Sequence, residues 1–368
     1  MPGRKHLNIF IITGMLLLFS CTKDKVEPVS WRPANINDGW SVSSLQAQDL
    51  DSSEVNNIFM DAEKLDNLYS LLIVKNGYLI AEKYFNGFTV NEAIQTASVT
   101  KSIISALTGI AIRENVIEGT DQKLKDFFPE IAWESTDPRK SEITVEQILE
   151  MRSGYPWEEV YGYLETLSRS SNWIPFLKEF PLVHDPGTQF GYSNFTAHIM
   201  GIIIARSAKQ SLLSFARDYL FDDLGISVPK WPADANGYYY GSGDIYMTPR
   251  NLAKFGQLFL DEGVWNGVQY IPSEWIKSSF QVYSSSTYGR DILTNIRTLK
   301  YGYLWWSGTS GSHQIWFAWG HGGQMVVIIH DLNMVVVATA YVPGIFDPDA
   351  WQESKAVMEL VGRFITKI

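Results

Sequence analysis

Patterns typical of β-strands lie near both ends of this chain, and patterns typical of helices lie between them. Two β-rich runs, 70–75 and 78–85, flank an Asn76-Gly77 pair, which predicts a tight antiparallel hairpin. The last third contains four more short β-type runs, 301–306, 315–318, 325–330 and 334–341. We therefore expect an α+β fold with one antiparallel sheet, built from both ends of the chain and flanked by helices.

Helical spacing of apolar residues predicts a mostly buried helix over 98–114. The stretch of about 120–265 contains helical patterns broken by proline and glycine, at 145–151, 198–208 and 252–260. An amphipathic helix over 353–365 closes the chain. With no internal repeat and no linker composition, we expect one two-lobed domain over 35–368, with a mostly helical lobe at about 120–265.

The first residues are typical of an export signal. A basic start is followed by a mostly apolar stretch, 7–20, which is shorter than the roughly 20 residues of a transmembrane helix. The stretch ends at Cys21, the only cysteine, in a context that resembles a bacterial lipobox. We expect a lipoprotein signal peptide over 1–20, a lipid anchor on Cys21 that binds a membrane, a polar tether over 21–34 and a location in the bacterial cell envelope. The alternative is a plain secretory signal with an incidental cysteine.

Composition excludes several classes of function. The 368 residues carry 30 basic and 40 acidic side chains, a net charge of −10, so nucleic acid is not an expected partner. One cysteine excludes a disulfide framework. The sequence has no HExxH, phosphate-binding or dinucleotide-binding motif, and its histidines show no zinc-type spacing, so we expect no metal and no cofactor. The oligomeric state is left open.

One short motif suits nucleophilic catalysis. Ser98 and Lys101 stand three residues apart at the start of the predicted buried helix, so both side chains lie on one face. A serine hydroxyl needs a nearby base, and a lysine in an apolar place can lose its proton and serve as that base. The same spacing at Ser20/Lys23 and Ser227/Lys230 does not open a long apolar helix. The structural alternative is Ser98 as a helix cap beside a solvated Lys101.

Two later segments of the sequence strengthen the catalytic interpretation of Ser98 and Lys101. Tyr192 and Asn194 form a Tyr-x-Asn pattern, and His321-Gly322-Gly323 precedes a predicted strand. Paired glycines at a strand edge allow a ligand or another backbone to approach closely. The structural alternatives are Tyr192 as a packed aromatic residue and Gly322-Gly323 as a β-bulge.

The three motifs, in this order, resemble those of the penicillin-recognising serine hydrolases. This group includes class C β-lactamases, related esterases and D-peptidases, and the 6-aminohexanoate-dimer-hydrolase-like branch is the most similar. Three further segments also resemble the family, at 148–154, 241–256 and 301–306. The resemblance extends over about 35–368 and implies a β-lactamase/transpeptidase-like fold.

The resemblance also implies roles for single residues. Ser98 matches the nucleophile, Lys101 the group that takes or relays its proton, and Tyr192 the residue that passes a proton to the leaving group. Asn194 matches an asparagine that binds substrate or Lys101. The backbone N–H groups of Ser98 and Gln324 match the oxyanion hole, and His321, Gly322 and Gly323 match the substrate-binding third motif.

At the third motif, lactamases have a lysine that binds a substrate carboxylate, whereas this chain has His321. Histidine has an unperturbed pKa of about 6.5 and is mostly neutral at pH 7. We therefore expect a hydrolase that cleaves an ester or amide of a small molecule or short peptide through an acyl-enzyme. A β-lactamase or D-alanyl-D-alanine peptidase is one alternative, and a non-catalytic binding lipoprotein that retains the fold is another.

Overall fold

The computed structural model of the chain describes residues 3, 31–286 and 295–368. The predicted signal peptide 1–20, the predicted lipidation site Cys21 and most of the tether 21–34 lie outside the described residues. In the part of the chain that is described, no helix is both long and apolar enough to span a membrane.

Within the described residues, a nine-stranded sheet combines strands from the first and the last third of the chain, as the sequence predicts. The strand order is β1-β3-β2-β13-β12-β11-β10-β9-β8, and every pair is antiparallel except β1 with β3. β2 from the first third therefore lies beside β13 from the last third, where Ser70 and Thr339 share a side-chain hydrogen bond of 2.7 Å. The strands of this sheet are β1 (Ser41–Val42), β2 (Leu68–Lys75), β3 (Tyr78–Tyr84), β8 (Ser284–Ser285), β9 (Arg297–Tyr301), β10 (Trp306–Ser310), β11 (His313–Gly320), β12 (Gln324–Ile329) and β13 (Met334–Ala340).

Helices cover both faces of this sheet. Every residue of β12 and β13 is buried, and successive side chains of a strand point to opposite faces, so neither face of these strands meets water. α10 packs on β2, β12 and β13, while α1 and α12 pack together against the sheet. The helices are α1 (Ser52–Ala62), α2 (Val99–Arg113), α3 (Leu124–Phe127), α4 (Val145–Leu149), α5 (Glu158–Tyr161), α6 (Leu164–Arg169), α7 (Phe176–Glu179), α8 (Asn194–Ala208), α9 (Leu212–Ala216), α10 (Pro249–Leu260), α11 (Ser273–Ser279) and α12 (Ala350–Lys367).

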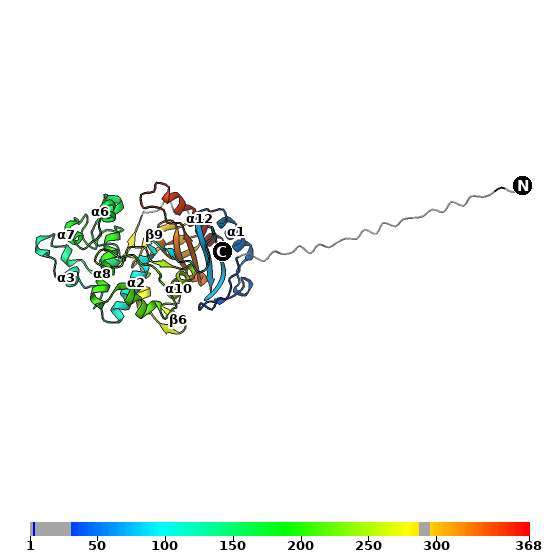
Figure 1. Cartoon of the computed structure of the whole chain (residues 1–368), viewed down its shortest axis with the longest axis horizontal. Coiled ribbons are helices and arrows are strands. Elements are labelled where there is room, and N and C mark those ends of the chain that lie inside the picture. The colour runs from blue at the N-terminus through cyan, green and yellow to red at the C-terminus, as the bar shows by residue number, and fades with distance from the viewer. Residues whose placement is uncertain (1–2, 4–30, 287–294) are drawn as a thin grey trace. The chain divides into compact units, whose positions relative to one another are not determined.

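α2 connects the sheet to the helices of the middle segment. Residues 99–111 are all buried, because α2 packs against β11 and β12 as well as against α8. Figure 1 shows the middle helices, among them α3, α6, α7 and α8, grouped beyond one end of the sheet. The described residues also form two short two-stranded sheets, β4 (Ile94–Gln95) with β5 (Tyr246–Met247) and β6 (Val264–Trp265) with β7 (Val268–Gln269).

The strand predicted over 301–306 is wrong. β9 ends at Tyr301 and β10 begins at Trp306, and Leu304 between them has a left-handed backbone with φ of 58°. Gly302 packs so tightly that an added Cβ would lie 2.1 Å from the backbone oxygen of Ser279. The aromatic run is therefore a tight connection between two strands, and its shape depends on a residue distant in sequence.

Candidate active site

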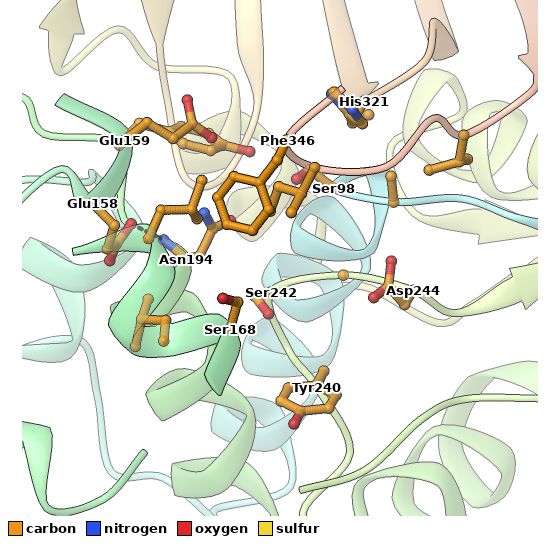
Figure 2. Close-up of a pocket in the computed structure, with 18 of the residues that line it drawn as sticks. Ser98, Glu158, Glu159, Ser168, Asn194, Tyr240, Ser242, Asp244, His321 and Phe346 are labelled. Carbon is orange, nitrogen blue, oxygen red and sulfur yellow. Dashed lines mark hydrogen bonds between the residues drawn. The ribbon is translucent and has the colours of Figure 1, made fainter. Parts of the chain in front are cut away.

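A cavity of about 950 Å³ opens where the sheet meets the middle helices. Its wall includes the start of α2, α5 and α6, the start of α8, the loop 240–244, the end of β11 and the loop 342–346. Figure 2 shows Ser98 inside this cavity, together with Asn194, Ser242, Asp244 and His321. The cavity thus brings residues of all three sequence motifs together.

Ser98 is held at the cavity by a constrained backbone. Ala97 has a left-handed conformation with φ of 46°, which costs a residue other than glycine about 1 kcal/mol. The Ala97 carbonyl accepts hydrogen bonds from the Thr100 hydroxyl at 2.7 Å and from the Asp244 backbone N–H at 3.2 Å. Ser98 itself makes no side-chain capping bond, which leaves its hydroxyl directed to other partners.

Lys101 lies directly behind the Ser98 hydroxyl. Its ammonium donates to Ser98 Oγ at 2.9 Å, to Asn194 Oδ1 at 2.8 Å and to the Ser242 backbone oxygen at 2.6 Å. The side chain is 1% exposed, and burial lowers the pKa of Lys101 to about 8, although the carboxylates of Glu158, Glu159 and Asp244 act in the opposite direction. At slightly alkaline pH, Lys101 is therefore a neutral amine in contact with the serine.

Tyr192 completes the arrangement around Ser98. Its ring lies under the Lys101 ammonium, 4.9 Å from Nζ to the ring centroid, and stacks on Trp306 with centroids 5.6 Å apart. Burial raises the pKa of Tyr192, and a hydrogen bond with Ser98 only partly opposes this. The phenol therefore keeps its proton at neutral pH and is a proton donor in the resting site.

Sequence reasoning missed Glu158, which organises the start of α8. One carboxylate oxygen accepts from the Ser193 hydroxyl at 2.6 Å and the Phe195 N–H at 3.0 Å, and the other accepts from the Asn194 N–H at 2.9 Å. Burial raises the pKa of Glu158 to about 7, and these hydrogen bonds act against that rise. Glu158 thereby fixes the backbone of the residue whose amide oxygen binds Lys101. In the sequence it looks like a solvated residue of a first helical turn, so no pattern would have identified it.

The third motif is only partly at the cavity. His321 lines it, packs edge-on against Trp351 with centroids 5.6 Å apart, and has its pKa lowered by burial, so the imidazole is neutral at pH 7. Gly322 and Gly323 do not line it. Added Cβ atoms there would meet the Tyr341 backbone oxygen at 2.1 Å and Val357 of α12 at 2.8 Å.

Gln324, predicted from the resemblance as an oxyanion-hole residue, lies away from the cavity. Gln324 is fully buried, pairs with Gly320 across the β11–β12 hairpin, and its amide side chain makes hydrogen bonds of 2.7 and 3.1 Å with the Ala340 backbone. It does not line the cavity. Gly320 packs against Thr96 and Ala97, and the next residue, His321, lies in the cavity wall with Ser98.

The fold and this cavity are those of serine hydrolases in which a lysine and a tyrosine adjoin the nucleophile. Residues 69–352 match the family described as β-lactamase, and the chain belongs to that family of serine hydrolases. Among the described residues, no group of three or more histidine, cysteine or acidic residues is placed to hold a metal ion.

Known proteins similar to this chain agree with the family. The 6-aminohexanoate-dimer hydrolase of Paenarthrobacter ureafaciens is 25% identical over 224 residues, which are 57% of this chain and 56% of that enzyme. The chain thus matches about half the length of this relative. A Bacillus anthracis protein, provisionally named a 6-aminohexanoate-dimer hydrolase, has a TM-score of 0.66 at 19% identity, over 89% of this chain and 86% of that protein. The D-amino acid amidase of Ochrobactrum anthropi has a TM-score of 0.63 at 17% identity, over 84% and 100%.

Proposed function

We propose that this protein hydrolyses an ester or amide bond through an acyl-enzyme formed on Ser98. The observation that carries the proposal is the 2.9 Å hydrogen bond between Ser98 Oγ and a buried lysine whose pKa of about 8 is near the working pH. A general base is most effective when its pKa is close to that pH. Tyr192 is the weaker candidate for the base, because burial raises the pKa of its phenol.

The first half of the reaction uses this pair. Neutral Lys101 takes the hydroxyl proton as Ser98 Oγ attacks the substrate carbonyl carbon. The negative charge that forms on the carbonyl oxygen is bound by the backbone N–H of Ser98 and, in place of Gln324, by that of His321. No acceptor is recorded for either N–H group among the described residues, so both are available to an oxyanion.

The second half releases the product. As the carbonyl re-forms, the bond to the leaving group breaks, and the leaving group takes a proton from Tyr192, which Lys101 replaces. Water then attacks the carbonyl carbon of the acyl-enzyme and gives a proton to the Lys101–Tyr192 pair. The bond from that carbon to Ser98 Oγ breaks, and Oγ takes a proton back from the same pair. The chemistry is the same for ester and amide substrates.

The cavity gives less support to the β-lactamase and D-alanyl-D-alanine peptidase alternative. Such substrates carry a carboxylate, and the described residues that line the cavity include no lysine or arginine to bind it. The neutral imidazole of His321 does not replace that charge. The binding-protein alternative is disfavoured because Ser98, Lys101 and Tyr192 are present and in contact.

Intact-mass spectrometry of residues 31–368 with three probes tests the proposal. A fluorophosphonate is expected to add to Ser98, p-nitrophenyl butyrate to be hydrolysed, and a fluorescent penicillin to form no adduct. A penicillin adduct that depends on Ser98 would favour the peptidase alternative, and nitrocefin turnover would then favour a lactamase. No adduct or turnover from folded protein would favour the binding-protein alternative.

The proposal includes a lipid anchor on Cys21 outside the cytoplasm. The support is the sequence alone, an apolar stretch of signal-peptide length that ends at the only cysteine of the chain. Cys21→Ser is expected to shift the full-length protein from the membrane fraction to the unprocessed or soluble form, as followed by fractionation and mass spectrometry. Unchanged membrane fractionation of this variant would contradict the anchor.

A further inference from the structure

The loop 240–244 supplies one of the three hydrogen-bond acceptors of Lys101. The Ser242 backbone oxygen accepts from the Lys101 ammonium at 2.6 Å. Beyond Ser242, the chain is fixed to the start of the nucleophile helix, because the Asp244 N–H donates to the Ala97 carbonyl at 3.2 Å and β5 then pairs with β4. The position of the Ser242 oxygen therefore depends on what holds the other side of the loop.

The other side of the loop is held by His198, a histidine of α8 that the mechanism does not otherwise use. His198 is fully buried, and its Nδ1 accepts a hydrogen bond from the Gly241 N–H at 3.3 Å. The loop lies directly on α8 at this point, because a Cβ added to Gly241 would be 2.5 Å from the Ala197 backbone oxygen. His198 follows Asn194 by four residues, so it lies on the same face of α8 as the amide oxygen that binds Lys101.

The hydrogen bond from Gly241 requires an unprotonated Nδ1 on His198. Burial lowers the pKa of His198, against the effects of the Asp234 carboxylate and the Tyr239 backbone, so the imidazole is neutral at pH 7 and carries its one proton on Nε2. Nε2 faces Asp234 Oδ2 at 3.5 Å, and neither side chain is exposed. Among the described residues, neither atom has another hydrogen-bond partner. The Asp234 carboxylate thereby favours the tautomer whose Nδ1 can accept.

Asp234 is itself held in one orientation. Its Oδ1 accepts from the backbone N–H groups of Asn236 and Tyr238, both at 2.9 Å, which leaves Oδ2 for His198. Although burial acts in the opposite direction, contact with His198 and these N–H groups lowers the pKa of Asp234, so the carboxylate is ionised at neutral pH. A chain of contacts thus runs from Asp234 through His198 to the loop that binds the catalytic lysine.

We propose that Asp234 and His198 are positioning residues, which hold the loop 240–244 so that the Ser242 oxygen binds Lys101. This inference rests on the proposed function and adds two residues to its site. A carbonyl oxygen that accepts from an ammonium group stabilises the charged form of that group, so loss of this contact is expected to lower the pKa of Lys101 further. The amine is then also less well aligned with the nucleophile, and kcat is expected to fall.

Three substitutions separate the roles of the two ring nitrogens. In His198→Asn, the amide oxygen can occupy the position of Nδ1 and accept from Gly241, whereas the amide of His198→Gln reaches the position of Nε2 instead. In Asp234→Asn, the side-chain oxygen stays with the two backbone N–H groups, so the NH₂ group faces Nε2 and moves the imidazole proton to Nδ1. For each variant, the pH dependence of kcat/KM for p-nitrophenyl butyrate and the melting temperature are measured.

The kinetic pKa of the wild type is expected to be that of Lys101, about 8. His198→Gln and Asp234→Asn are expected to lower it by about 0.5 or more and to reduce kcat roughly fivefold. His198→Asn is expected to keep the kinetic pKa of the wild type, although it leaves the buried Asp234 carboxylate unpaired and so is the less stable of the two histidine variants. A purely structural role would instead make the pH profile follow stability.

His313→Gln is the matched control. His313 also contacts an aspartate, since its Nδ1 lies 2.7 Å from Asp331 Oδ2, but it does not line the cavity. This variant is expected to keep both the kinetic pKa and kcat of the wild type.

A ¹⁵N spectrum of the wild type with labelled histidine tests the tautomer without any variant. His198 is expected to carry its proton on Nε2 at pH 7, and a proton on Nδ1 or on both nitrogens would overturn the inference. It would also be overturned if His198→Gln and Asp234→Asn kept the wild-type kinetic pKa, or if His198→Asn shifted it as far as His198→Gln does. These results would leave the hydrolase proposal intact. A folded wild type without ester turnover would contradict that proposal, and the inference would fail with it.

Discussion

Ser98→Ala is expected to reduce kcat/KM for p-nitrophenyl butyrate by roughly 10⁴-fold or more, because the acyl-enzyme then has no oxygen on which to form. The melting temperature is expected to change by no more than about 2 °C. Ser98 makes no side-chain cap to α2, and its hydroxyl contributes little to the core. Steady-state kinetics and thermal unfolding of the same preparation measure both quantities.

The contrast between activity and stability makes this result informative. An inactive variant with an unchanged melting temperature identifies a chemical role, whereas an inactive and unstable variant identifies a structural one. Ser102→Ala is a suitable control, because Ser102 is a buried serine of the same helix that donates to the Leu304 backbone oxygen at 2.7 Å. It is expected to lose stability but keep most of its activity. Wild-type rates in Ser98→Ala would refute the nucleophile assignment.

The second large effect is expected at Lys101. In the wild type, kcat/KM for a neutral ester is expected to rise about tenfold per pH unit below pH 8 and to level off above it, because only neutral lysine accepts the serine proton. Lys101→Met is expected to lower the rate at pH 8 by about 10³-fold and to abolish this pH dependence. Lys101→Arg is expected to be equally inactive, since guanidinium does not lose its proton.

Although Lys101→Met is expected to lose activity, it is not expected to lose stability. Since burial holds the pKa of Lys101 below its unfolded value, folding is penalised wherever the unfolded lysine is charged, at pH values below about 10. Lys101→Met removes this penalty, so its melting temperature at pH 7 is expected to equal or exceed that of the wild type. A loss of activity that merely follows unfolding would contradict a role as base.

Lys254→Met is the matched control for this experiment. Lys254 is also a buried lysine, 2% exposed, with its pKa lowered by burial, but its ammonium donates to the Leu224 backbone oxygen and lies outside the cavity. The variant is expected to keep the wild-type pH profile of kcat/KM. A flat wild-type profile between pH 6 and pH 9 would exclude Lys101 as the base.

The parts of the fold that depend on local chemistry could be predicted from the sequence. The Asn76-Gly77 turn has positive φ at both residues, 52° and 77°, as a two-residue hairpin requires, and β2 and β3 flank it. The buried helix predicted over 98–114 is α2. The strand predicted over 301–306 is wrong because aromatic residues there are typical of a strand, whereas the actual end of the strand depends on tertiary packing. Gly302 packs against Ser279, which is distant in sequence, and the strand ends just before it.

At the site, too, the residues that the sequence does not reveal are those whose position depends on contacts with distant parts of the chain. Ser98 and Lys101 are visible in the sequence because one helical turn brings them together. Glu158 is not, because its burial depends on Ser193 and its neighbours, 35 residues further along the chain. The family resemblance implies Gln324 by its place after the glycine pair, but the pairing of Gly320 with Gln324 closes a short hairpin, and of these residues Gly320 and His321 line the cavity. The position of a residue within a sequence motif does not determine where the hairpin turn falls, and the turn decides which residues reach the cavity.

The pairing of β2 with β13 has a consequence for the order in which this chain folds. Ser70 and Thr339, which meet there, are 269 residues apart, so the centre of the sheet cannot close before almost the whole chain has been synthesised. Until then, the apolar face of the β2–β3 hairpin stays uncovered and exposed to other chains. Closure of the sheet therefore depends on β13, and a chain that stops before residue 334 has no strand to pair with β2 on the side away from β3.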